Sequence, residues 1–275
     1  MSKLSHDPNL TLTAERAEAA ALMSFMRAPA RDVSARLGVS LIQEGGAVAA
    51  FVPAADVLAL NRVIGLGVHA AASETQLDRI LAAAKAAGVR RLFLQITPDA
   101  QPAELTKWIE ARGGVPHNRW VRLWRGVHEE PLPEATLKVV QVRTLRADAF
   151  AHVVRIAFGM PEMIDPMLTA TVGTPGWQHY VVRNQTKVVA TGAFFAVRGV
   201  AWLGFAATLP DHRGQGAQSS LVATRLRAAA AMDCRMAVTE TIEETPEHPV
   251  QSYRNMLRLG FHEAYHRQNY VITMA

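Results

Sequence analysis

The chain has 275 residues, of which 49% are hydrophobic and 19% are charged. A chain of this length and apolar content can bury a sizeable core, which excludes a mostly disordered protein and predicts two domains of about 130 residues each. The net charge of +5 favours anionic partners. The basic residues are scattered, however, so a nucleic-acid partner is not expected.

Membrane insertion and secretion are not expected either. No stretch of the sequence approaches the ~18–20 consecutive apolar residues that a membrane-spanning helix needs. The first eight residues lack an apolar signal core. Cys234 is the single cysteine, which rules out an internal disulfide and favours a small buried hydrophobic role. We therefore expect a cytoplasmic protein.

The first half of the chain predicts alternating helices and strands. Thr13 is a suitable N-cap for a helix over 13–27, and Gly45-Gly46 indicates a hairpin. Ser73 and Gln76 form a capping box at the start of another helix. The expected elements are a helix at 13–27, strands at 39–43, 47–52 and 61–69, a helix at 74–87, a strand at 92–96, a helix from Pro102 to Gly113 and a strand at 117–126.

The charged, proline-rich segment 129–134 is the best candidate for a linker. We expect a first domain over 1–130, a linker over 131–136 and a second domain over 137–275. The elements expected in the second half are strand 137–145, a helix from Asp148, a short helix near 164–171, strands 177–183, 187–197 and 200–208, a helix to about Met232, strand 235–241, helix 249–259 and strand 262–272.

The two halves repeat nearly the same order of elements, although their sequence identity is poor. We therefore expect two domains of one α/β architecture, each with a mostly antiparallel central sheet flanked by helices.

The glycine-containing turn within 205–220 carries the clearest chemistry. An apolar strand over 200–205 runs into a turn with Gly214 and Gly216, and a helix follows. Glycine lets the backbone approach a ligand closely, and the free N–H groups at the helix start point toward it. The helix dipole and Arg213 add positive charge at that end. The turn is therefore suited to hold phosphate.

The first half lacks such a turn. Residues 69–73, between the corresponding strand and helix, contain neither glycine nor arginine. We interpret the first domain as a non-catalytic copy that binds no coenzyme.

The spacing Arg213-x-x-Gly216 at the head of a helix resembles the Arg/Gln-x-x-Gly-x-Gly/Ala signature of the GNAT superfamily, the acetyl-coenzyme A-dependent N-acetyltransferases. Gln218 stands where that signature has Gly or Ala. The resemblance covers most of 137–275, but covers 1–128 only in topology. It implies a tandem GNAT-like protein with a degenerate first copy, and acetyl-CoA as the co-substrate of the second.

The resemblance also implies two groups of coenzyme-binding residues. Ala206, Ala207 and Thr208 match the strand end whose backbone pairs with the pantetheine arm, and an N–H there would stabilise the oxyanion. The second group lies at the turn and the helix start, where backbone groups would hold the pyrophosphate: Arg213, Gly214, Gln215, Gly216, Ala217, Gln218 and Ser219.

Direct attack of an amine on a thioester requires a base for the amine and a proton donor for the thiolate. The resemblance implies that the strand before the glycine turn is splayed apart from the next strand, with the pantetheine arm in the gap. Glu240 lies on the strand opposite this splay and is the expected base. Many relatives carry a donor Tyr four residues before the Gly that ends the last helix, and Met256 occupies that position here. Tyr253 and its neighbour Ser252 lie about one helical turn earlier and are candidate substitutes.

Metal binding is not expected, because His262 and His266 have no evident third ligand. The expected activity is transfer of acetyl from acetyl-CoA to a primary amine of a small molecule or an amino terminus. One alternative, favoured by Met256, is a regulatory protein that binds the coenzyme without catalysis. Another, suggested by the basic pI, is a nucleic-acid-associated protein. The sequence leaves both a monomer and an oligomer open.

Overall fold

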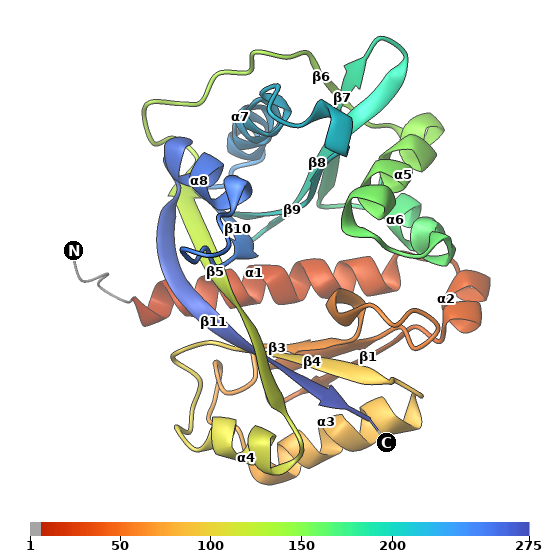
Figure 1. Ribbon diagram of the computed structural model, residues 1–275, viewed down its shortest axis with the longest axis vertical. Helices are drawn as coiled ribbons and strands as arrows, with labels where there is room; N and C mark the ends of the chain where they lie inside the picture. Colours follow the sequence, from red (N-terminus) through yellow and green to blue (C-terminus); the bar gives the residue numbers. More distant parts are fainter. Residues whose placement is uncertain (1–6, 275) are drawn as a thin grey trace. The chain divides into compact units, whose positions relative to one another are not determined.

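The computed structural model describes residues 7–274, which form two compact units (Figure 1). Unit 1 consists of the described residues up to Arg122, together with Glu240–Thr245 and the residues from Glu263 onward. Unit 2 consists of Leu123–Thr239 and Pro246–His262. Both units contain a sheet with helices against it, so the predicted α/β class is confirmed.

The compact units do not follow the expected split at 131–136. That segment lies inside unit 2, and almost all of the last strand belongs to unit 1. The reason is strand pairing: residues 268–273 of the last strand pair antiparallel with Arg91–Ile96. Pairing between segments so far apart in sequence is invisible to linker composition.

Unit 1 is built on a mixed sheet. Its strands follow the order β1-β2-β3-β4-β11-β5, with β3 and β4 parallel and the pairs β1–β2, β2–β3 and β4–β11 antiparallel. Their bounds are β1 (Ser40–Glu44), β2 (Ala47–Phe51), β3 (Arg62–Ile64), β4 (Arg91–Ile96), β5 (Val115–Gly126) and β11 (His262–Thr273).

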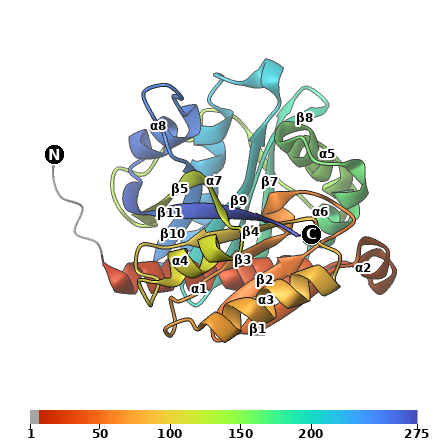
Figure 2. The same cartoon turned by 60° about the horizontal axis from the view of Figure 1, so that its bottom comes forward.

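The helices of unit 1 are α1 (Pro8–Arg27), α2 (Arg31–Leu37), α3 (Glu74–Ala86) and α4 (Leu105–Ala111). Leu77 and Ile80 of α3 are fully buried in a core with Leu92 and Leu94 of β4. The predicted N-cap of α3 is confirmed, since Ser73 accepts a hydrogen bond from the Gln76 N–H at 3.1 Å. Figure 2 shows α3 lying along the strands of this sheet.

Two predicted elements of unit 1 have different bounds. The first helix begins at Pro8 and not near Thr13, because Asp7 caps it and proline suits its first position. The strand predicted over 61–69 ends at Ile64. Gly65 and Gly67 then take positive φ angles of 73° and 77°, which turn the chain.

Unit 2 has a sheet with the order β10-β9-β8-β7-β6, in which β9 and β10 are parallel and the other neighbours antiparallel. Its strands are β6 (Val139–Gln141), β7 (Trp177–Asn184), β8 (Lys187–Val197), β9 (Val200–Thr208) and β10 (Met236–Ile242), whose end lies in unit 1. Its helices are α5 (Ala147–Phe158), α6 (Asp165–Ala170), α7 (Ala217–Ala230) and α8 (Gln251–Arg258).

Helices α5 and α7 cover opposite faces of this sheet (Figure 1). Phe150 of α5 packs edge-on against His179, with 4.9 Å between ring centroids. Arg225 of α7 lies against Gly192, which pairs with Tyr180, the next residue along β7. Successive residues of a strand point to opposite faces, so α5 and α7 are on different sides.

No helix within residues 7–274 is long and apolar enough to cross a membrane.

Candidate functional site

A cavity of about 710 Å³ lies in unit 2, between the end of β9, the start of α7 and one side of α8. Nine of the ten coenzyme-binding residues predicted from the sequence line it, all except Gln215. The lining residues are Ala157, Phe158, Thr191, Ala206, Ala207, Thr208, His212, Arg213, Gly214, Gly216, Ala217, Gln218, Ser219, Leu221, Arg225, Gln251, Ser252, Asn255 and Arg258.

The turn before α7 needs glycine at two positions. Gly214 and Gly216 have φ angles of 74° and 81°, in the region that side chains disfavour. A Cβ on Gly214 would meet nothing within 4 Å, so the backbone conformation and not crowding accounts for that glycine. Gly216 is the N-cap of α7, and the first N–H groups of a helix have no partner inside it. These donors can hold an anion.

Gln218 is compatible with this arrangement. It is the second residue of α7, so its backbone is helical. Its side chain is held by α8, because Asn255 Nδ2 donates to Gln218 Oε1 at 2.6 Å. Asn255 Oδ1 in turn accepts from Gln251 Nε2 at 2.9 Å. The side chain that departs from the expected Gly or Ala is thus bonded to Asn255, and the backbone N–H groups of the turn keep their positions.

The end of β9 is irregular on the side of β8, and its described ladder with β10 stops before that end. Ala207 pairs with Thr191 and Gly204 with Ala193, which leaves Phe205 and Ala206 together opposite Gly192, a β-bulge. On the other side, the described ladder with β10 covers only Val200–Trp202. The backbone near Ala206 is therefore accessible to a ligand, as the predicted splay requires.

Residues 143–261 match the model of the acetyltransferase (GNAT) family. This segment is a GNAT acetyltransferase domain. The matched segment includes the bulge, the glycine turn and α8, which are the parts that form the cavity. No curated protein matches the sequence.

Solved structures show how far the fold extends. A GCN5-related N-acetyltransferase from Kribbella flavida is similar over 88% of this chain and 94% of its own, with a TM-score of 0.62 and 20% identity. A conserved protein of unknown function from Staphylococcus epidermidis is similar over 87% and 96%, with a TM-score of 0.59 and 11% identity. A tandem GNAT protein from the clavulanic acid biosynthesis pathway is similar over 88% and 86%, with a TM-score of 0.58 and 15% identity. At sequence identities of 11–20%, the similarity to these three structures establishes the fold alone.

The cavity of the GNAT domain is positively charged. Its described lining residues include His212 and three arginines, Arg213, Arg225 and Arg258, and no acidic residue. Arg213 Nε donates to the Thr208 carbonyl at 3.4 Å, which ties the turn to β9. Burial lowers the pKa of Arg225 to about 10, so its guanidinium stays charged at neutral pH. A ligand that carries several phosphates would match this charge.

The predicted catalytic residues are not all at the cavity. Ser252 lines it, whereas Tyr253 and Glu240 are not among the lining residues. Met256, at the position where relatives have a tyrosine, is buried with 5% of its surface exposed. Of these three residues, the structure thus brings only Ser252 to the cavity that the predicted coenzyme-binding residues line.

Glu240 lies in a buried ion cluster of unit 1 that sequence reasoning missed. Its carboxylate accepts a hydrogen bond from Arg267 and lies 3.2 Å from Arg122 Nη2 and 3.8 Å from Arg62 Nη1. Burial and the charge of Glu18 raise the pKa of Glu240, against the opposing charges of the arginines. One sequence signal could have revealed this cluster: two glutamates, Glu15 and Glu18, stand in a helix that is otherwise rich in alanine and mostly buried.

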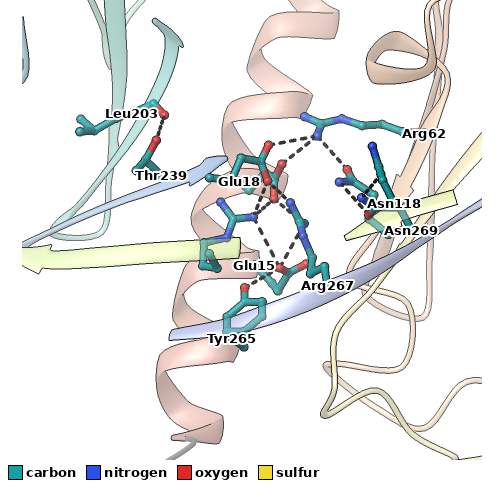
Figure 3. Close-up of polar contacts among 12 residues, drawn as sticks. Glu15, Glu18, Arg62, Asn118, Leu203, Thr239, Tyr265, Arg267 and Asn269 are labelled. Atoms are coloured by element: carbon teal, nitrogen blue, oxygen red, sulfur yellow. Dashed lines mark hydrogen bonds and ion pairs between the residues drawn. The ribbon is translucent and has the colours of Figure 1, made fainter. Parts of the chain in front are cut away.

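Glu18 is at the centre of this cluster, which Figure 3 shows on one side of α1. It accepts from Arg62 Nη1 at 2.8 Å and from Arg267 Nη1 at 2.7 Å, and it also pairs with Arg122. Burial acts to raise the pKa of Glu18, but the three arginines outweigh it and hold that pKa well below its usual range. Tyr265 donates to Glu15 at 2.6 Å. No group of acidic, His or Cys side chains within residues 7–274 is arranged to hold a metal ion.

Proposed function

We propose that the protein is an acetyl-CoA-dependent N-acetyltransferase that moves acetyl to a primary amine of a small molecule or an amino terminus. The observation that carries the proposal is the meeting of the glycine turn, the bulged end of β9 and three arginines around one cavity of a GNAT domain. Acetyl-CoA supplies the activated acetyl group as a thioester, and the chain's residues bind and orient it.

The residues at the cavity fit this co-substrate. The N–H groups at the start of α7, with Gly214 and Gly216 allowing close approach, would hold the pyrophosphate. The backbone at Ala206 to Thr208 would run beside the pantetheine arm. The absence of acidic side chains among the described lining residues supports an anionic ligand.

The reaction would proceed by direct attack. The amine nitrogen, after losing a proton, forms a bond to the thioester carbon, and the carbon–sulfur bond then breaks to release the thiolate. Among the predicted donors we favour the Ser252 hydroxyl, which would donate a hydrogen bond to the departing thiolate and relay a proton to it from water, because Ser252 lines the cavity while Tyr253 does not. Glu240 stays the predicted base. Its raised pKa suits that role, but its pairing with Arg267 and Arg122 opposes proton uptake.

We further propose that the first copy, over 1–130, has no coenzyme site. β3 ends at Ile64, so the segment before α3 is 65–73 and does turn at two glycines, Gly65 and Gly67. It contains no arginine, and Ser73, not a glycine, caps α3, so the chain has no full counterpart there of the Arg213–Gly216 turn.

Release of coenzyme A thiol from acetyl-CoA, measured across a panel of amines and amino-terminal peptides, tests the proposed activity. Amine-dependent thiol release with acetylated product supports it. The second candidate is a regulatory protein that binds acetyl-CoA without catalysis, which the buried Met256 favours. Tight coenzyme binding with no thiol release on any amine would replace the first proposal by the second.

A further inference from the structure

The bulge on β9 is held by a side chain of the neighbouring strand. Thr191 Oγ1 donates a hydrogen bond to the Phe205 carbonyl oxygen at 3.0 Å, and Thr191 is fully buried. Phe205 itself has a φ of 51°, which a bulky residue adopts only when its surroundings enforce it. The Thr191 hydroxyl is one of the contacts that enforce it.

This bond also fixes the direction of the next amide. The Phe205 carbonyl and the Ala206 N–H belong to one planar trans peptide, in which they point in opposite directions. Because Thr191 lies on β8 and holds the carbonyl toward that strand, the Ala206 N–H points away from β8. Ala206 lines the cavity, and that side of β9 is the one where the ladder with β10 has ended.

The opposite face of the sheet contributes Arg225. Its Nη1 donates to the carbonyl of Ala193, which lies on β8 next to the bulge of β9, at 3.1 Å. Its Nε donates to the Leu221 carbonyl in α7, also at 3.1 Å. Only 2% of the residue is exposed, and its described hydrogen bonds go to two backbone carbonyls and not to an acid. An apolar side chain would fill this space at lower cost in desolvation, so an arginine here adds two things: its charge at the cavity and the hydrogen bond to β8.

Gly192, the residue opposite the bulge, makes room for this arginine. A Cβ at position 192 would lie 3.0 Å from both Cζ and Nε of Arg225, closer than ordinary contacts allow. Gly192 has no positive φ, so space and not backbone conformation accounts for the glycine. The bulge is thus held from one face by Thr191 and from the other by Arg225 packed over Gly192.

We propose that Thr191 and Arg225 are positioning residues for acyl transfer: they fix the bulge so that the Ala206 N–H points at the acyl oxygen of the bound thioester. The inference rests on the proposed function and deepens it. A donor aimed in advance stabilises the oxyanion of the tetrahedral intermediate, and removal of one such donor costs about 10²–10³ in kcat. Neither residue needs to touch the acyl group.

The test compares two threonines that donate to β9. Thr191→Val removes the hydroxyl that holds the bulge. Thr239→Val removes an analogous bond, from Thr239 Oγ1 to the Leu203 carbonyl at 3.1 Å, outside the bulge (Figure 3). Thr191→Ser keeps the hydroxyl and is the rescue variant. Thr191→Val and Thr239→Val make the same exchange of a hydroxyl for a methyl, whereas Thr191→Ser deletes a methyl that is fully buried. The free energy of unfolding of each variant is therefore measured beside its kcat.

We expect Thr191→Val to lower kcat by about tenfold or more while the Kd of coenzyme A, held at the turn, changes by less than about twofold. Thr191→Ser and Thr239→Val should keep kcat within about threefold of wild type. Arg225→Met should lower kcat as Thr191→Val does. Equal losses of kcat in Thr191→Val and Thr239→Val, or an unchanged kcat in Thr191→Val, would overturn the inference.

Two further readouts separate this inference from the proposed function. The affinity of acetyl-CoA relative to coenzyme A should fall in Thr191→Val even if the protein proves to be non-catalytic, because the Ala206 N–H would contact only the acyl group. The amide chemical shifts of Phe205 and Ala206 in the ligand-free protein, measured by NMR, should change in Thr191→Val and not in Thr239→Val. Unchanged shifts would refute the bulge assignment by themselves, whereas a wild type that binds no coenzyme would refute the proposed function.

Discussion

Asn255 of α8 donates a hydrogen bond to the side chain of Gln218, the second residue of α7, with 2.6 Å between Nδ2 and Oε1. The contact joins the two helices at the wall of the cavity. It explains how a residue larger than the Gly or Ala of the GNAT signature is accommodated: the side chain is held by α8, and the backbone stays helical.

The first prediction concerns this pair. Gln218→Ala removes a side-chain hydrogen bond and should lower the free energy of unfolding by about 0.5–1.5 kcal/mol. The Kd of coenzyme A should change by less than about threefold, since in the proposed function backbone N–H groups, and not this side chain, would hold the pyrophosphate. Denaturant unfolding and calorimetric binding check both effects. A loss of binding beyond tenfold would show that the Gln218 side chain is itself a coenzyme ligand.

The ion cluster of unit 1 gives a second prediction. Arg122→Met leaves Glu18 without one of its three arginines, and breaking a buried pair on one side costs about 3–5 kcal/mol. Arg79→Met, which removes an exposed pair with Glu44, should cost less than about 1 kcal/mol. Urea unfolding compares the two variants. Similar small losses would show that the cluster contributes little to stability.

The third prediction is a pH dependence that arises at His179. Burial lowers the pKa of His179 to about 4 from the ordinary 6.5. Thr171 Oγ1 donates to the Leu168 carbonyl at 2.8 Å, so His179 Nε2, also at 2.8 Å from Thr171 Oγ1, carries a proton and donates to Thr171. Burial keeps the other ring nitrogen unprotonated, so the folded protein holds the neutral ring at neutral pH.

Below pH 6.5 the unfolded chain therefore takes up a proton at His179 that the folded chain does not. The stability from this residue is complete above pH 6.5 and is lost as the pH falls toward 4, by about 2–3 kcal/mol at pH 4.5. The difference in unfolding free energy between wild type and His179→Leu, measured from pH 7.5 to 4.5, should shrink by that amount. A constant difference would mean that the ring titrates normally.

Much of the fold was accessible from the sequence because it depends on local signals. Ser73 and Gln76 predicted the start of α3, and Gly214 and Gly216 predicted the glycine turn before α7. Both signals are local, because helix caps and positive φ angles depend on residues close together in the chain. The α/β class followed from the order of the elements.

The missed features depend on contacts between distant segments. The bulge at Phe205 appears only when β8 and β9 are set in register. The cluster at Glu240 needs side chains from α1, β3, β5 and β11, which no spacing rule brings together. The same holds for the last strand, whose pairing with β4 assigns it to unit 1.

A fourth prediction ranks the candidate proton donors. Ser252→Ala should lower kcat, because Ser252 lines the cavity. Tyr253→Phe should leave kcat nearly unchanged. Steady-state kinetics checks both variants. The reverse ranking would return the donor role to Tyr253, and no effect from either would show that the thiolate leaves without a protein acid.

The central claim is that the turn at Gly216 holds coenzyme A. Isothermal calorimetry of acetyl-CoA with wild type and with Gly216→Glu tests it most directly, since a glutamate there combines a negative charge with a side chain at a φ of 81°. We expect the wild type to bind acetyl-CoA and the variant to lose at least about tenfold in affinity. Equal affinity in the two proteins, with both folded, would contradict it.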